Sequence, residues 1–75
     1  MKLCELKKGE KGKVIAINTN NIKLRRRILD MGLTLGTQVK IKKIAPFGDP
    51  ISVELRGYEL CLRKSELSNI EVDKL

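Results

Sequence analysis

The residues of this sequence that could carry out chemistry are few. There are two cysteines and no histidine, so the chain lacks the usual general base near neutral pH, the usual partner of a nucleophilic serine or cysteine, and the commonest metal ligand. Cys4 and Cys61 are too distant in sequence to form a CxxC pair, and no imidazole or other sulfur could complete a tetrahedral zinc site. We therefore expect neither a hydrolase nor a metal centre, and no bound cofactor.

The length of the sequence narrows the class of protein further. A chain of 75 residues is predicted to form one domain over residues 1–75, and it buries only about 60% of its unfolded surface, too little to enclose a deep substrate cleft. No stretch approaches the roughly 18 apolar residues that span a bilayer, and the sequence starts without the apolar segment of a secretion signal. We expect a non-enzymatic cytoplasmic protein in which both cysteines are free, buried or half-buried thiols.

The basic charge of the chain is concentrated in its first part. Of the 16 basic and 9 acidic residues, residues 1–43 hold 12 basic and 3 acidic ones, whereas residues 44–75 hold 4 and 6. A basic face of this kind attracts nucleic acid, an acidic protein surface or an anionic membrane leaflet. Charge alone does not choose among these partners.

One clear helix is predicted, at residues 22–31. It follows the turn-forming run 18–21, which supplies an N-cap, and it ends before Gly32, at a position that a helix C-cap favours. On a helical wheel Leu24, Ile28 and Met31 point toward the core. The opposite arc is formed by Lys23, Arg26, Arg27 and Asp30.

The three arginines of this helix are expected to differ in environment. Arg25 lies at the border of the apolar arc, so its stem should be partly buried while its guanidinium reaches a carbonyl or a carboxylate. Arg26 and Arg27 should be free and, with Lys23, could form a partner-binding face. Such a face is also compatible with simple solvation.

Short strands are predicted on both sides of the helix. A helical turn that directs Leu3 and Leu6 inward precedes a strand at residues 11–18, and because the run 14–17 is apolar on both faces we expect this strand to be covered on both sides. Alternation from Thr37 predicts a second strand with a bulge near Lys43.

The next two strands are predicted to form a hairpin with Arg56 and Gly57 as a two-residue turn. This register pairs Leu55 with Tyr58, Val53 with Leu60 and Ile51 with Leu62. It also places Glu54 opposite Glu59, an unfavourable pair of like charges unless Lys40 sits beside them. A helical turn at 63–67 and a strand from Ile70 follow. Because curling removes open sheet edges, we expect a mainly β fold, a small five-stranded SH3-like barrel with one inserted α-helix.

The segment 45–50 is predicted to be a rigid connection. Pro46 and Pro50 restrict the backbone, Gly48 supplies a positive φ and Asp49 can bond back to the backbone. One interpretation is a stiff hairpin loop and nothing more. The other is that the loop, through Pro46, Phe47 and Asp49, presents an exposed aromatic side chain to a partner.

Several segments together resemble the ferrous iron transport protein A (FeoA) family, and the likeness extends from Leu3 to Val72. They are MGL at 31–33 with Gly36, APFGDPI at 45–51, RGY at 56–58 and LCLRKSE at 60–66. One departure is Leu35, where members of the family often have proline. The resemblance implies a cytosolic SH3-like barrel that supports or regulates a large membrane protein, a FeoB-type G protein that moves Fe²⁺ inward. Transition-metal binding is a property of the family only, because these residues assemble no ligand set.

Two functional hypotheses remain open from the sequence. The first is a non-enzymatic adaptor that binds the cytosolic part of the transporter and is peripheral to the inner membrane at most. The second is a small nucleic-acid-binding barrel, although Phe47 and Tyr58 are the only aromatics that could stack on bases, so no specific nucleic acid is expected. The same shortage of aromatics argues against polyproline recognition. Gly32, Gly48, Gly57, Tyr58 and Arg25 are assigned structural roles.

Overall fold

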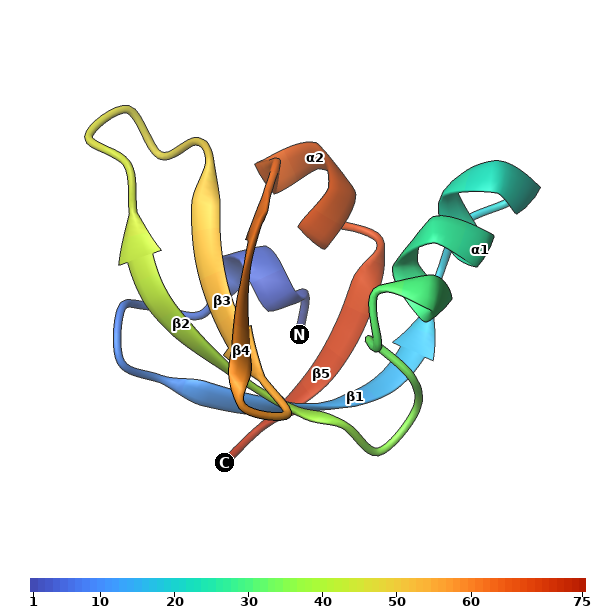
Figure 1. Cartoon of the computed structure of the whole chain (residues 1–75), viewed down its shortest axis with the longest axis horizontal. Coiled ribbons are helices and arrows are strands. Elements are labelled where there is room, and N and C mark those ends of the chain that lie inside the picture. Colours follow the sequence, from blue (N-terminus) through green and yellow to red (C-terminus); the bar gives the residue numbers. More distant parts are fainter.

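The computed structural model describes residues 1–75, and its elements follow the predicted order. They are η1 (Leu3–Glu5), β1 (Lys11–Ile17), α1 (Ile22–Asp30), β2 (Gln38–Ile44), β3 (Ile51–Leu55), β4 (Tyr58–Leu62), α2 (Lys64–Leu67) and β5 (Ile70–Lys74). All five strands belong to one antiparallel sheet in the order β4-β3-β2-β1-β5 (Figure 1). The prediction of a mainly β, SH3-like fold with one inserted helix is confirmed.

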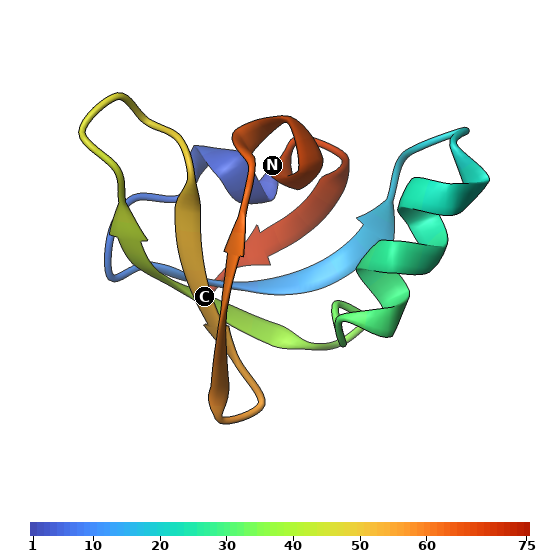
Figure 2. The ribbon, with the colours of Figure 1, turned by 45° about the horizontal axis from the view of Figure 1, so that its top comes forward.

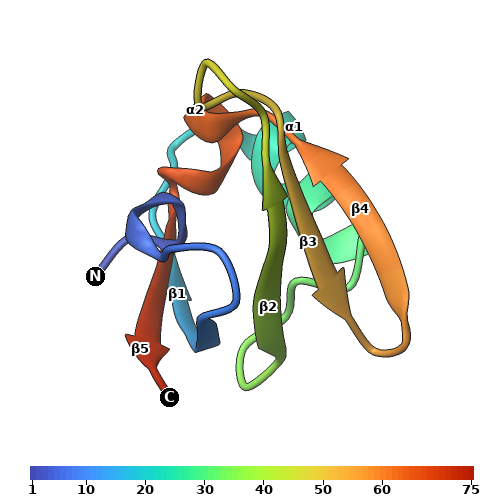
Figure 3. The same cartoon turned by 90° about the vertical axis from the view of Figure 1, so that its left-hand side faces the viewer.

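The sheet curls strongly but does not close. β4 and β5 are its two outer strands and do not pair with each other, so the expectation that closure removes both edges is wrong (Figure 3). The chain reaches β5 from β4 through the short helix α2, and η1 packs against both α2 and β5. Leu3 and Leu67, both fully buried, fill the space between the outer strands in place of a fifth hydrogen-bonded ladder.

The core is a single cluster of apolar side chains on the concave face of the sheet. Leu3 and Leu6 belong to it, as predicted, because the turn η1 folds under the sheet. Alternate residues of the strands supply most of the rest. The cluster is completed by Val14, Ile17, Ile28, Leu33, Val39, Ile41, Ile51, Val53, Leu55, Leu62, Leu67, Ile70 and Val72.

The hairpin of β3 and β4 has the predicted register and turn. Arg56 and Gly57 adopt φ values of 48° and 84°, as a two-residue turn between twisted strands requires. Glu54 does lie opposite Glu59, and Lys40 does pair with Glu54 in the register. The bulge between Ile41 and Lys43, however, brings a different cation to the carboxylate, because Nζ of Lys42 lies 3.6 Å from Glu54.

The outer face of β1 is less covered than its sequence suggested. Ile15 is 43% exposed, so the prediction that both faces of this strand are buried is wrong. The reason is the placement of α1, which lies beside the C-terminal end of β1 and leaves the middle of the strand open (Figure 1).

The thiols are free, as expected, but only Cys4 is half-buried and Cys61 is exposed. None of the helices combines the length and the apolar character needed to cross a bilayer.

Candidate partner-binding site

Local interactions determine where α1 begins and ends. The Asn21 side chain accepts a hydrogen bond from the Leu24 amide at 3.1 Å, which caps the first turn. The helix stops at Met31, and Gly32 follows with a φ of +94°. Ile28 anchors the helix in the core, with Leu24 and Met31 packed beside it. The predicted inward face is therefore correct.

Arg25 secures the start of the helix to the sheet. Its guanidinium donates to the carbonyl oxygens of Ile17 at 3.0 Å and Thr19 at 3.2 Å. The predicted contact with a carbonyl is confirmed, but Arg25 is exposed instead of partly buried. The guanidinium bridges two surface carbonyls at the exit of β1, which keeps the side chain outside the core.

Arg27 is not free, which corrects the prediction that it faces a partner. Its Nη1 lies 3.0 Å from Oε2 of Glu66, whose side chain is only 12% exposed. α2 brings this carboxylate up to the polar side of α1, so the ion pair joins the two helices. Lys23 and Arg26 are exposed and form no ion pair. They are the part of the predicted basic face that is available.

An apolar groove of about 390 Å³ runs between α1 and β1. Leu29 and Leu35 are 39% and 66% exposed beside it. Sequence reasoning missed this groove because its residues come from three separate segments. Two features of the sequence could have indicated the groove: β1 has a second apolar face, and Leu29 lies at the flank of the apolar arc of the helix. The groove is lined by Ile15, Ala16, Ile17, Arg25, Leu29 and Leu35.

Tyr58 attaches the far end of α1 to the sheet. Its hydroxyl donates to the Met31 carbonyl, and a Cβ at Gly32 would overlap that hydroxyl. Tyr58 itself is 41% exposed and does not belong to the core. The helix is thus fixed at both ends, by Arg25 and by Tyr58.

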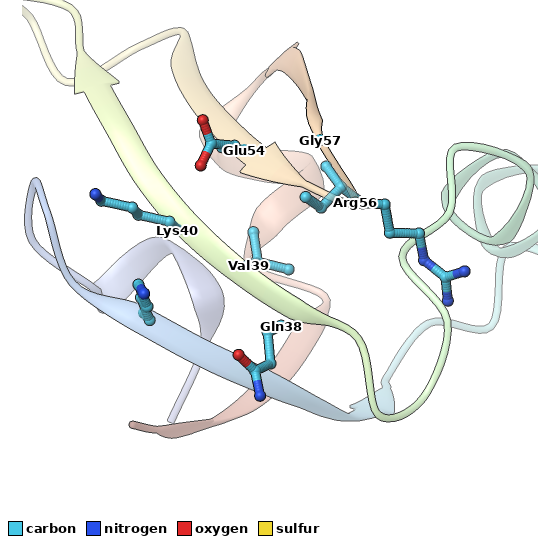
Figure 4. A pocket seen from close by; sticks show the side chains of 8 residues that line it. Gln38, Val39, Lys40, Glu54, Arg56 and Gly57 are labelled. Carbon is cyan, nitrogen blue, oxygen red and sulfur yellow. The ribbon is translucent and has the colours of Figure 1, made fainter.

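A polar depression of about 240 Å³ lies between β1, β2, β3 and the β3–β4 turn (Figure 4). Lys40 and Arg56 line it but point away from each other, whereas Lys11, the cross-strand neighbour of Lys40, lines it as well. Arg56 donates to the hydroxyls of Thr34 at 2.9 Å and Thr37 at 3.0 Å. This side chain supports the segment that follows α1.

The β2–β3 loop is held by hydrogen bonds and presents one aromatic ring. The Gly48 amide donates to the Ala45 carbonyl at 2.7 Å, and Gly48 has the expected positive φ of +84°. Asp49 accepts a hydrogen bond from the Lys64 amide at 2.8 Å, so its carboxylate caps α2 and the structure gives it a structural contact besides the predicted binding role. Phe47 is 97% exposed.

These features define a small SH3-like domain whose helix and loop are held by specific contacts. No three His, Cys, Asp or Glu side chains come together in an arrangement that could hold a metal ion. The FeoA domain model matches residues 1–74, and the chain belongs to this family.

Solved structures and a curated relative agree with this assignment. A FeoA-like protein from Clostridium acetobutylicum is 48% identical, with a TM-score of 0.91 over all of this chain and 86% of that one. Stenotrophomonas maltophilia FeoA, a prokaryotic SH3 domain protein solved with zinc, is 28% identical, with a TM-score of 0.85 over 97% of this chain and 89% of that one. An Fe(2+) transport protein A/Fe(2+) transporter FeoB fusion protein from Porphyromonas gingivalis is 30% identical over 73 residues. The match covers 97% of this chain but only 8% of the fusion protein.

Proposed function

We propose that this chain, as one FeoA-like domain, is a non-catalytic cytoplasmic accessory of a ferrous iron transporter and binds the transporter's cytosolic GTP-binding part. The observation that carries the proposal is the fusion protein of Porphyromonas gingivalis, in which a relative of this chain and the transporter form one polypeptide. Joining two modules keeps them at high effective concentration, which is useful when they act on each other.

The surface around α1 is the best candidate for the contact. Leu29 and Leu35 form part of an exposed apolar groove, and Lys23 and Arg26 lie on the same helix as Leu29 without an acidic partner. An apolar centre with a charged rim is the usual anatomy of a binding surface. The two free cations of the helix favour an acidic segment of the transporter that carries an apolar side chain for the groove.

The exposed chemistry of this surface supports binding over catalysis. Amines, a guanidinium group and aliphatic side chains can attract and desolvate a partner, and the guanidinium of Arg25 is already bonded to two carbonyls. A general acid or base with a shifted pKa is the feature that would favour an enzyme. Glu10, whose pKa is lowered chiefly by the hydrogen bond with Lys74, lies outside the groove in a surface ion pair.

The proposal is tested by binding to the purified cytosolic domain of a FeoB-type transporter from the same organism. Replacing Lys23 and Arg26 together by Glu reverses both charges without touching the core. We expect association to weaken by at least tenfold, chiefly through a slower and less salt-sensitive on-rate. Arg27 is left unchanged because its replacement would also break the ion pair with Glu66.

A matched control carries the same change of charge elsewhere. Lys7 and Lys11 are exposed and form no ion pair, so replacing both by Glu should preserve most of the binding. Equal binding by both double mutants and the parent would exclude α1 as the contact surface. No binding by the parent, together with RNA binding that persists near physiological salt, would favour the nucleic-acid alternative.

A further inference from the structure

The β2–β3 loop forms a second exposed surface, far from α1. Figures 1 and 2 show the loop and α1 at opposite ends of the longest axis, which measures 30 Å. Phe47 is 97% exposed at the tip, and Ile44 at the base of the loop is 40% exposed. Pro46 and Pro50 are also exposed. This end of the molecule is therefore an apolar projection with a large aromatic ring at its extremity.

The projection is stiff. Two hydrogen bonds close it, from the Ala45 amide to the Pro50 carbonyl at 3.1 Å and from the Gly48 amide to the Ala45 carbonyl at 2.7 Å. Asp49 ties it to α2 through the Lys64 amide. Because the loop is already ordered, holding Phe47 away from the protein requires no further loss of backbone entropy on binding.

Cationic side chains surround the apolar tip. Lys8 and Lys43 line a groove of about 610 Å³ together with Ile44 and Pro46. Arg63 lines a second depression beside Pro50. None of these three cations takes part in an ion pair.

Two carboxylates lie near the loop, and each accepts a hydrogen bond from within the protein. The carboxylate of Asp49 accepts the Lys64 amide. The carboxylate of Glu59, in the same groove as Lys8, accepts the Ser52 hydroxyl at 3.4 Å. Both carboxylates keep their negative charge, but the three cations Lys8, Lys43 and Arg63 outnumber them, so this end of the molecule remains positive and can attract anions.

We propose that this loop end, defined by Phe47, Ile44, Lys8, Lys43 and Arg63, docks on an anionic membrane surface. Aromatic rings settle at the headgroup level of a bilayer, and basic residues close to an anionic leaflet are attracted to it. A convex tip with one ring enters a fluid interface readily, whereas a protein partner would need a preformed pocket for Phe47. The inference does not depend on the transporter assignment, because the lipid surface alone is the ligand.

Phe47→Trp tests the insertion directly, since the chain contains no other tryptophan. With vesicles of phosphatidylcholine and phosphatidylglycerol at low salt, we expect the emission to shift to shorter wavelength and to be quenched by brominated lipid chains. Vesicles of phosphatidylcholine alone should give a much smaller response. Unchanged emission with the anionic vesicles overturns the proposal.

Co-sedimentation with the same vesicles measures how much each part of the surface contributes. Phe47→Ala should lower partitioning roughly tenfold, and replacing Lys8 and Lys43 together by Gln should lower it roughly 25-fold, about fivefold for each cation. Phe47 makes no core contact and both lysines are exposed, so these variants should fold normally. Parent-like binding by either variant contradicts the proposal.

Two matched controls are needed. The first shows whether the loop or α1 binds the vesicles, and the second shows whether the partner of the loop is lipid or protein. Replacing Lys23 and Arg26 by Gln should leave vesicle binding at about 0.1 M salt within twofold of the parent, because that surface then lies more than the Debye length of about 10 Å away; an equal loss there would mean unspecific attraction to the whole basic domain. Leu35→Trp places the same probe at the groove. If the tryptophan at position 47 responds to the transporter domain and not to vesicles, the loop binds protein and the membrane proposal is wrong.

Discussion

Gly32→Ala tests whether Tyr58 really fixes the end of α1. The methyl group would be added at a φ of +94°, where L-residues are strained, and it would overlap the Tyr58 hydroxyl. The hydroxyl would then have to leave the Met31 carbonyl, to which it donates a hydrogen bond. The substitution should therefore disturb the backbone and the contact between β4 and α1 at once.

The two effects can be separated by a second glycine. Gly36 has a nearly equal φ of +88° with no atom within 4 Å of an added Cβ, so Gly36→Ala measures backbone strain alone, about 1–2 kcal/mol. Gly32→Ala should add the lost hydrogen bond, about 0.5–1.5 kcal/mol, and the displacement of the ring. We expect a total of about 2–4 kcal/mol, a large part of the roughly 4–11 kcal/mol typical for a domain of this length.

Removing the hydroxyl should relieve the overlap. In Gly32→Ala combined with Tyr58→Phe, the nearest ring atom, Cζ, would lie 3.7 Å from the new methyl group, which is ordinary van der Waals contact. The double mutant should therefore be more stable than the sum of the single mutants predicts, by about 1 kcal/mol. Urea unfolding of the four variants measures these free energies. Equal losses for Gly32→Ala and Gly36→Ala, or strict additivity in the double mutant, would refute the proposed contact.

Three further predictions test other parts of the structure. Gly57→Val should lower the thermal midpoint by several degrees, because the turn holds φ at 84°; an unchanged midpoint would contradict the turn. Arg27→Ala should lower the free energy of unfolding by about 1–3 kcal/mol, since the buried Oε2 of Glu66 accepts no hydrogen bond and would also lose its ion pair; a loss no larger than that of an exposed control such as Arg26→Ala would contradict this. A hydrogen bond from Lys74, helped by one from a backbone amide, lowers the pKa of Glu10 below its ordinary value of 4.5. Ionised Glu10 thus stabilises the fold above pH 4.5, and this contribution is lost as the pH falls through the lowered pKa of the folded state. The urea midpoint of Glu10→Gln should therefore depend less on pH below pH 5 than that of the parent. An unchanged pH dependence of the midpoint would refute the role of Glu10.

The succession of strands along the chain and the hairpin register could be predicted because period-two alternation leaves little freedom. A shift of one residue in β4 would have moved Leu60 and Leu62 to the solvent face and Cys61 into the core. Gly57 defined the turn that set this register. The helix was equally well marked, since Asn21 and Gly32 carry the chemistry of its two caps.

The surroundings of α1 could not be predicted in full, because they depend on how separate segments meet. Arg27 is bound by a carboxylate 39 positions later in the chain, on α2. Asp49 likewise caps α2 through a hydrogen bond with a residue that is distant in the chain, Lys64. A helical wheel shows which side of a helix is polar, but it does not show which polar residues another element will neutralise.

The positions of the two exposed surfaces suggest how they would work together. The groove at α1 and the Phe47 loop lie at opposite ends of a molecule 30 Å long, so one partner patch of ordinary size could not cover both easily. If the loop rests on the bilayer, α1 is held within one molecular length of the headgroups, where the cytosolic domain of a membrane transporter begins. Two weak contacts of this kind reinforce each other, because the first raises the local concentration for the second. Phe47→Ala should therefore weaken association with the transporter embedded in anionic vesicles, yet leave binding to its isolated cytosolic domain unchanged. A loss of equal size in both assays would place the loop in the protein interface instead.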